Sequence, residues 1–379
     1  MKLEFTYQQK MILKMVREFA DKEVAPIASE LDEKGEYPTK TLEKMAKLGL
    51  LGIIIPREYG GAGLDTISYS IVVEEISRKC ASTGVITSVH NSLTAWPIMK
   101  YGNEDQKKKY LPILAKGEKI GAFAATEPNA GSDLGAIRTT AELKGDNYII
   151  NGDKTFITSG PEAGIIIVFA VTDKSLGSKG ISAFIVENDM KGYKVGSIFE
   201  KLGINASKTS ELIFENMEVP KENLLGREGE GFKIALSTLD GGRIGIASQA
   251  VGIAQAALDE SIEYSKQRQQ FGRPIAKFQA IQWMIADMAT KIEASRYLVY
   301  NAAYKKDIGE KISKEAAMAK LFASDTAMNS VIKAVQIHGG YGYTKEYTVE
   351  RLFRDAKITE IYEGTSEVLK MVIAGSLLK

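Results

Sequence analysis

The chain is poor in several residue types, and each scarcity excludes a class of protein. Among its 379 residues there are one cysteine and two histidines. The single cysteine, Cys80, cannot form an intrachain disulfide framework, so we expect a reducing, cytoplasmic environment. Because cysteine and histidine are so few, the usual zinc sites cannot be built, and we predict no metal site.

The chain also lacks an excess of charge and any long apolar run. Its 49 Lys and Arg against 48 Asp and Glu leave a net charge of +1, so we expect no nucleic-acid partner. The longest apolar run, Ile165 to Val171, is too short to span a membrane, and no membrane insertion is expected. The beginning of the chain carries acidic Glu4 and no apolar signal core, which argues against secretion. Neither a G-x-G-x-x-G nor a P-loop pattern occurs, so a Rossmann site and nucleotide triphosphate hydrolysis have no support.

The sequence divides into three segments with different residue patterns, as expected of a chain too long for one ordinary hydrophobic core. The first and last segments carry apolar residues at helical spacing, as at Met11, Met15 and Phe19. The middle segment has short β-rich runs, one of which ends in a turn signal at Gly152. We therefore predict an α+β fold with an N-terminal helical domain over residues 1–119, a central antiparallel β-domain over 120–225 and a helical domain over 226–379.

The most informative stretch surrounds Glu363, a lone carboxylate that follows two apolar residues and precedes a glycine. Thr365 and Ser366 behind it are residue types that begin a helix. A carboxylate on such an elbow can project into an apolar cleft, where desolvation raises its pKa and makes it a stronger base. With so few histidines and cysteines, acid–base work falls mainly to carboxylates. Alternatively, Glu363 is only a negative charge near the N-terminus of the last helix, where the helix dipole stabilises it.

Several short strings occur in order over nearly the full chain. They are ATEPNAGSD at 125–133, KTFIT at 154–158, TLDGGRIG at 238–245, RQQFGRP at 268–274, and RDAKI at 354–358, which leads into YEGT at 362–365. Together they resemble the flavin-dependent acyl-CoA dehydrogenases, and residues 238–255 are most similar to the short-chain, butyryl-CoA branch. The resemblance implies a helical domain, a β-domain and a C-terminal four-helix bundle, and a role in fatty acid β-oxidation.

The resemblance also implies a reaction. Glu363 would abstract the Cα proton of an acyl-CoA thioester while a hydride passes from Cβ to N5 of FAD. Because a Cα–H beside a thioester is a poor acid, the base must be desolvated and the developing enolate stabilised. The backbone N–H of Glu363 and a ribose hydroxyl of FAD would hold the thioester oxygen, and electron-transferring flavoprotein would accept the electrons. Gly242 agrees with this base, since relatives that carry their base on this helix have Glu there.

Three groups of residues resemble the family's FAD contacts. One side of a flavin cradle comprises Phe123, Ala125, Thr126 and Ser132, and the other comprises Phe156, Ile157 and Thr158. A second group would meet the adenine and pyrophosphate of the neighbouring subunit's FAD, which implies a homo-oligomer, most simply a tetramer: Arg268, Phe271, Gln279, Gln336, Gly339 and Gly340. Thr365 and Glu367 complete the set. The family often has Trp where Phe156 stands and Asn where Ser159 stands, which concerns packing against the flavin ring.

Other residues resemble contacts to the CoA side of the substrate: Ser132, Asp240, Arg243 and Gly364. For several of these positions a purely structural role stays open as an alternative. Arg243 is alternatively an ion-pair residue of the helix bundle, Phe156 a residue of the β-core, and Gly339 with Gly340 a helix C-cap. Trp96, in the helix that leads toward the acyl pocket, either shapes that pocket or packs between helices.

Alternative functions within the same fold also stay open. They are reduction of an enoyl-CoA in an anaerobe, dehydrogenation of a branched or cyclic acyl-CoA, an oxidase that passes electrons to O₂, and a nucleic-acid-binding relative. Residues 80–96 contain no Arg to hold the distal carboxylate of a glutaryl-CoA. They also contain no Asp or Glu for the 1,4-elimination of a cyclic substrate. The acyl chain length, the direction and the electron partner are not determined by the sequence.

Overall fold

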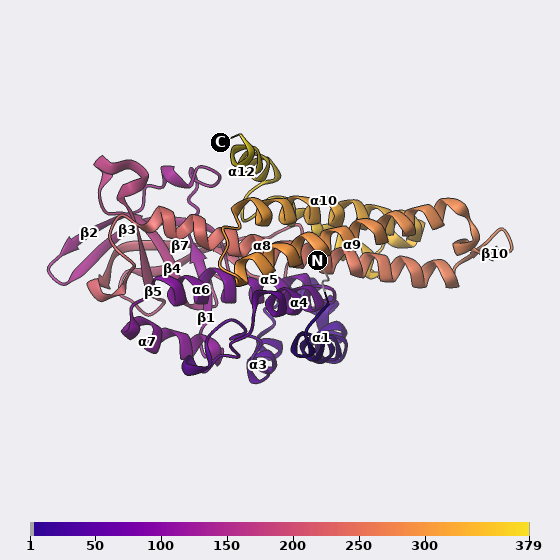
Figure 1. Ribbon diagram of the computed structural model, residues 1–379, viewed down its shortest axis with the longest axis horizontal. Coiled ribbons are helices and arrows are strands. Elements are labelled where there is room, and N and C mark those ends of the chain that lie inside the picture. Colours follow the sequence, from indigo (N-terminus) through magenta and orange to yellow (C-terminus); the bar gives the residue numbers. More distant parts are fainter. Residues whose placement is uncertain (1–3, 379) are drawn as a thin grey trace.

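The computed structural model describes residues 4–378, and its elements run from helices through a sheet to helices (Figure 1). This order confirms the predicted α+β fold. The helices are α1 (Tyr7–Phe19), α2 (Ala28–Lys34), α3 (Thr39–Lys47), α4 (Thr66–Ser77), α5 (Ala81–Ser88), α6 (Trp96–Tyr101), α7 (Glu104–Ala115), α8 (Gly231–Gln267), α9 (Gln279–Asp307), α10 (Ser313–His338), α11 (Thr348–Lys357) and α12 (Ser366–Leu377). The strands are β1 (Ile120–Ala124), β2 (Thr140–Lys144), β3 (Asn147–Thr158), β4 (Ala163–Val171), β5 (Ile181–Glu187), β6 (Tyr193–Ile198), β7 (Thr209–Pro220), β8 (Leu224–Leu225), β9 (Gln269–Gln270) and β10 (Arg273–Pro274).

The N-terminal helices pack against the bundle through α4 and α5, whose residues are all buried. A buried π-helical turn over Val89–Ala95 continues α5 and carries Leu93 toward α8. Helix α1 buries Val16 and Phe19 as its spacing predicts, but Met11 is 49% exposed and lies outside the core. Among residues 4–378, no helix is both long and apolar enough to cross a membrane.

The main sheet has the strand order β6-β7-β3-β2-β4-β5-β8, with β1 paired to β4. Most pairs are antiparallel, but β4 pairs in parallel with β1 and, at one residue, with β2. The sheet is therefore mixed, where purely antiparallel pairing is expected from the sequence. The turn expected at Gly152 is wrong, since β3 continues through this residue to Thr158. A Cβ at Gly152 would lie 2.7 Å from the Cα of Thr139, so the glycine permits close backbone approach instead.

The C-terminal bundle is formed by α8, α9 and α10, which run side by side away from the sheet (Figure 1). At the end of the bundle farthest from the sheet, the β9–β10 hairpin connects α8 to α9 (Figure 1). The 37-residue α8 is buried over most of its length, and its many Ala and Gly residues let neighbouring helices approach closely. Helices α11 and α12 pack on α10. Helix α11, which the sequence analysis does not predict, is a short amphipathic helix that buries Val349 and Leu352.

Candidate active site

Glu363 lies in the short connection between α11 and α12 and has an unusual backbone. Its φ is +53°, and that of Gly364 is +105°. The left-handed region is uncommon for a residue with a side chain, and such conformations are held by the surrounding structure. Thr365 caps α12 and accepts a hydrogen bond from the backbone N–H of Val368 at 3.3 Å, as its sequence predicts. The elbow therefore exists and points the Glu363 side chain inward, away from the helix that follows.

The Glu363 carboxylate is buried and has no partner. Neither oxygen has a hydrogen bond to any described residue, and both are shielded from solvent. This burial raises the pKa of Glu363 to about 7, although the positive charges of Lys320 and Arg243 oppose the rise. The alternative that Glu363 is a surface charge at a helix end does not account for a desolvated, unpaired carboxylate. Such a group is what a general base at neutral pH requires.

Two buried cations hold the elbow from opposite helices. Arg243 of α8 donates from Nε to the Glu363 carbonyl oxygen at 3.3 Å, and Lys320 of α10 donates from Nζ to the Gly364 carbonyl oxygen at 2.6 Å. Arg243 also donates to Asp240 at 2.8 Å, and Asp240 accepts a further bond from the Ser313 hydroxyl. The ion pair within the bundle, one of two interpretations of Arg243, is therefore present. The same contacts place Asp240, Arg243 and Gly364 within one cluster.

Gly242 faces the carboxylate directly. A Cβ placed on this glycine would lie 2.1 Å from Oε2 of Glu363 and 2.6 Å from Cδ2 of Leu93. Position 242 of α8 and the side chain of residue 363 thus converge on one point in space. A side chain at position 242 would occupy the space that the Glu363 carboxylate fills, so the glycine leaves room for this carboxylate.

The two halves of the predicted flavin cradle lie together in the β-domain. The Thr155 N–H donates to the Thr126 carbonyl at 2.9 Å. Beside them, fully buried Lys154 donates to the Glu127 carboxylate at 2.8 Å and to the Ala125 carbonyl at 3.2 Å. This buried ion pair ties the string at 125–133 to the string at 154–158.

Phe156 projects from this cradle with 64% of its surface exposed and a φ of +56°. Its ring centroid lies 4.8 Å from that of Phe199. The interpretation of Phe156 as a β-core residue is therefore wrong. Ser159, at φ +59°, is buried and hydrogen-bonded to the Tyr37 hydroxyl at 3.0 Å, which fixes the turn behind it.

The remaining cradle residues differ in how they can meet a ligand. Ala125 and Ile157 are buried, at 4% and 2% exposure, so they can offer only backbone groups. Phe123 is half-buried and packs on Phe169, with ring centroids 5.0 Å apart. Thr126 and Thr158 are half-buried, and Ser132 is exposed.

The second predicted group lies at the far tip of the bundle, away from the sheet (Figure 1). All of its members are exposed: Arg268, Phe271, Gln279, Gln336, Gly339 and Gly340. The Arg268 guanidinium lies 5.5 Å from the centre of the Tyr341 ring, and Phe271 is 93% exposed. Gly339 is the C-cap of α10, as the alternative structural interpretation predicts. A Cβ on Gly339 or Gly340 would meet nothing within 4 Å. One chain therefore does not bring this group to the cradle.

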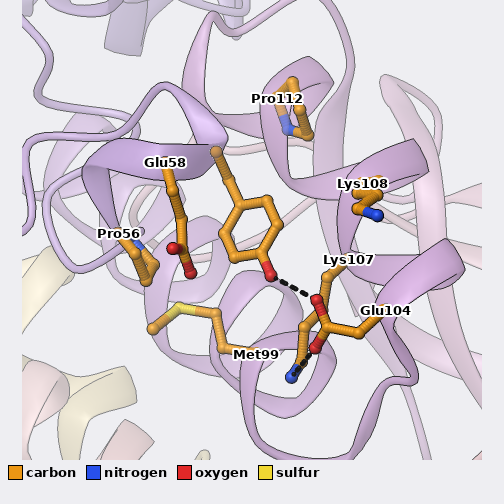
Figure 2. Close-up of a pocket in the computed structure, with 8 residues that line it drawn as sticks. Pro56, Glu58, Met99, Glu104, Lys107, Lys108 and Pro112 are labelled. Carbon is orange, nitrogen blue, oxygen red and sulfur yellow. Dashed lines mark hydrogen bonds and ion pairs between the residues drawn. The ribbon is translucent and has the colours of Figure 1, made fainter.

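The surface has two pockets of interest, and only one of them is lined by predicted site residues. Thr365 and Glu367 line a pocket of about 660 Å³ between α9, α10 and α12. A second pocket of about 570 Å³, on the N-terminal domain, contains none of the predicted residues (Figure 2). There the Tyr59 hydroxyl donates to Glu104, whose other oxygen pairs with Lys107 (Figure 2).

Comparison with known proteins accounts for these features. Models of the N-terminal, middle and C-terminal domains of acyl-CoA dehydrogenase match residues 6–118, 122–217 and 229–378.

The chain belongs to the acyl-CoA dehydrogenase family.

Similar proteins span the whole chain. The short-chain-specific acyl-CoA dehydrogenase of Clostridium acetobutylicum is 56% identical, with 100% of each chain covered. The acryloyl-CoA reductase (NADH) of Anaerotignum propionicum is 51% identical over 100% of this chain and 96% of its own. Butyryl-CoA dehydrogenase of Megasphaera elsdenii has a TM-score of 0.99 at 50% identity, with full coverage of both chains. A chain solved in work on the electron transferring flavoprotein of Acidaminococcus fermentans has the same TM-score at 56% identity, again with full coverage of both.

Family membership makes this chain an FAD-dependent oxidoreductase. Its own residues fit such a cofactor. The open aromatic face of Phe156 stands on a fixed turn beside the cradle, and the glycines at the bundle tip leave room for close approach. Arginine, with its planar fork, suits a pyrophosphate.

Sequence reasoning missed several residues of the site. Lys320 is fully buried beside the elbow, and Lys154 with Glu127 holds the cradle. A signal for Lys320 exists, because it is a lone charge on an α10 face of buried alanines such as Ala316, Ala319 and Ala323. Trp96 lies over the buried Lys306 ammonium, 4.9 Å from its ring centre, which supports packing between helices over a role in the acyl pocket.

Proposed function

We propose that this protein catalyses the α,β-dehydrogenation of a short-chain acyl-CoA of the butyryl-CoA type, with Glu363 as the catalytic base. The observation that carries the proposal is the buried carboxylate of Glu363, which has no hydrogen-bond partner and a pKa of about 7. An unpaired carboxylate is costly to bury, and a substrate proton is the partner it lacks. The similarity to short-chain-specific and butyryl-CoA dehydrogenases supports the choice of substrate.

In this mechanism Glu363 takes the Cα proton, and the trans-2-enoyl-CoA is formed as the Cβ hydride leaves. FAD, when bound, supplies the hydride acceptor at its N5 position. The elbow positions the base, because Arg243 donates to the carbonyl oxygen of Glu363 and Lys320 to that of Gly364. Burial keeps water from the carboxylate, so the base is not weakened by hydration. Ser132, Asp240, Arg243 and Gly364 are proposed to face the CoA portion.

We further propose that FAD is shared between subunits of a homo-oligomer, most simply a tetramer, and that electron-transferring flavoprotein accepts the electrons. The separation of the cradle from the exposed group at the bundle tip supports a shared cofactor. Large exposed apolar residues on the bundle, such as Trp283 at 67% and Met371 at 72%, support an interface between chains. The chain solved in work on an electron transferring flavoprotein supports the partner.

A second candidate is the reverse reaction, reduction of a short enoyl-CoA. The similarity to the acryloyl-CoA reductase of Anaerotignum propionicum favours it. The same base would then return a proton to Cα, so the site geometry fits both directions.

The test is a panel of C4 to C16 acyl-CoAs with a dye acceptor, run beside an absorbance spectrum of the purified protein. We expect bound FAD and the highest kcat/KM on butyryl-CoA, since one methylene in a fitted pocket changes the free energy by about 1–3 kcal/mol. A preference for octanoyl-CoA would overturn the short-chain proposal. Crotonyl-CoA with a reduced dye measures the reverse direction, and peroxide formed in equal amount to product would indicate an oxidase.

Arg268→Ala tests the shared cofactor. We expect it to lose FAD and to weaken the oligomer together, as followed by size-exclusion with flavin absorbance. Full FAD occupancy on an intact oligomer would contradict the assignment of Arg268.

A further inference from the structure

Lys320 is buried without the partner that a buried ammonium ordinarily needs. It is 0% exposed, and it forms no ion pair with any described carboxylate. Its hydrogen bond goes to the Gly364 carbonyl oxygen at 2.6 Å. Its α10 neighbours Ala316, Ala317 and Ala323 are fully buried and offer no polar group. A buried charge is destabilising unless hydrogen bonds or a nearby opposite charge compensate for it.

The nearby group is Glu363, one residue before the carbonyl that Lys320 holds. Burial lowers the pKa of Lys320 to about 7, and the Glu363 carboxylate is the foremost charge that opposes this fall. In return, Lys320 is the foremost charge that holds down the pKa of Glu363. The ammonium therefore favours the ionised base without binding its oxygens, because its hydrogen bond is used on the backbone.

Arg243 does not make Lys320 redundant. The Arg243 guanidinium is paired with Asp240 at 2.8 Å, so much of its field at Glu363 is cancelled. The other groups that act on this cluster are neutral or acidic. They are Tyr69 of α4, Tyr362 of the elbow, and Glu360 and Glu367 on either side of it.

Resting on the function proposed above, we propose that Lys320 is a positioning residue for the base, acting in two separable ways. Its hydrogen bond to the Gly364 carbonyl fixes the left-handed elbow that aims Glu363, and its positive charge, while Lys320 is protonated, increases the fraction of Glu363 that is ionised. Lys320 touches neither substrate nor cofactor in this role.

Two variants separate these contributions. Lys320→Gln keeps a hydrogen-bond donor and removes the charge, whereas Lys320→Met removes both at similar volume. Removal of a neighbouring positive charge raises a carboxyl pKa by about one unit or more. We expect the pH midpoint of kcat/KM to move upward by that amount in both variants, with about tenfold lower activity at pH 6.5. The plateau at high pH should fall further in Lys320→Met than in Lys320→Gln.

The matched control is Lys314→Met on the same helix, whose lysine is more exposed and pairs with Glu315. It should leave the midpoint unchanged. A midpoint in Lys320→Gln equal to that of wild type would overturn the role of the charge. Equal plateaus in the two Lys320 variants would overturn the role of the hydrogen bond. If Lys320→Met fails to fold, the midpoint of Lys320→Gln still decides the electrostatic claim.

A second measurement does not depend on catalysis. The pKa of Glu363 can be obtained from the pH dependence of the unfolding midpoint, comparing each protein with the same protein carrying Glu363→Gln. We expect Lys320→Gln to raise the pKa obtained in this way. If Glu363→Gln is active, the proposed function fails, yet this thermal measurement still reports whether Lys320 acts on Glu363.

Discussion

Two buried glutamates, each beside a buried lysine, have opposite environments in this molecule. In the β-domain, Glu127 accepts hydrogen bonds from Lys154 at 2.8 Å and from the backbone N–H groups of Arg138 and Thr139 at 2.6 and 2.9 Å. These donors outweigh burial and lower its pKa. At the elbow, Glu363 has no donor at all, and burial raises its pKa to about 7.

The difference depends on where the lysine places its hydrogen bond. Lys154 binds the carboxylate, and the resulting pair is structural, because it joins the two halves of the cradle. Lys320 binds a backbone carbonyl beside its glutamate and leaves the carboxylate free. The same two residue types thus make a fixed cross-link in one place and leave an unpaired carboxylate, the proposed base, in the other.

The largest effect should follow removal of the unpaired carboxylate. Glu363→Gln keeps the shape of the side chain and removes the base, so FAD and acyl-CoA should still bind. Turnover should fall by roughly 10²–10⁴, at the upper end because no second base lies nearby. Steady-state kinetics with a dye acceptor measure the loss, and Glu360→Gln, whose carboxylate is paired with Lys357, is the control. Activity above a tenth of wild type would mean that another residue is the base.

Removal of the paired carboxylate should act on stability. Glu127→Gln leaves the Lys154 ammonium buried without its counter-charge, which typically costs about 3–5 kcal/mol. We expect a lower unfolding midpoint in urea and weaker retention of FAD, while Glu363→Gln should show neither. Combining Glu127→Gln with Lys154→Met should recover part of the loss, because no charge is then left unpaired. An unchanged midpoint in the single variant would show that the pair does not hold the cradle.

These two glutamates also show which features of this protein can be predicted from its sequence and which cannot. The helical periodicity and the strings around Glu363 predict the domain order and the elbow, because both depend on local residue types. The environment of each carboxylate depends on residues outside its own segment of the chain, such as Lys320 for Glu363 and Lys154 for Glu127. Only the folded chain shows which lysine binds a carboxylate and which binds a backbone carbonyl.

The bulge at Gly152 has a similar origin. The Asn151-Gly152 pair is a turn signal in sequence, but here β3 continues because β7 pairs with it on both sides of the bulge. Likewise, the parallel pairing of β1 with β4 joins two strands that β2 and β3 separate in sequence, and no local pattern encodes it.

A smaller effect is expected from crowding the base without removing it. Gly242→Ala places a methyl group where Oε2 of Glu363 now lies, so the carboxylate must move. A displacement of about 1 Å can reduce a rate by about 10²-fold, and we expect a loss of that order in kcat with normal FAD content. Gly241→Ala, the adjacent position, would meet the flexible end of Lys306 instead and is the control. Wild-type kcat in Gly242→Ala would contradict the position assigned to the carboxylate.

The smallest effect, and the one that contrasts the two glutamates most directly, is the pH dependence of stability. The pKa of Glu363 is raised from its ordinary value of 4.5 to about 7 in the folded protein. The folded state therefore binds more protons than the unfolded state between these values, and stability falls as pH rises through that window. Glu127 has a lowered pKa, so its contribution is present above pH 4.5 and is lost as pH falls through its folded pKa.

Relative to wild type, Glu363→Gln should become progressively more stable from pH 4.5 to 7, by at most about 1.4 kcal/mol for each pH unit. Glu127→Gln should instead be least stable, relative to wild type, above pH 4.5 and should approach wild type in more acidic solution. Unfolding midpoints of the three proteins across pH 4 to 8 measure both trends, and slopes of the same sign would mean that the two carboxylates do not differ in the way their surroundings indicate.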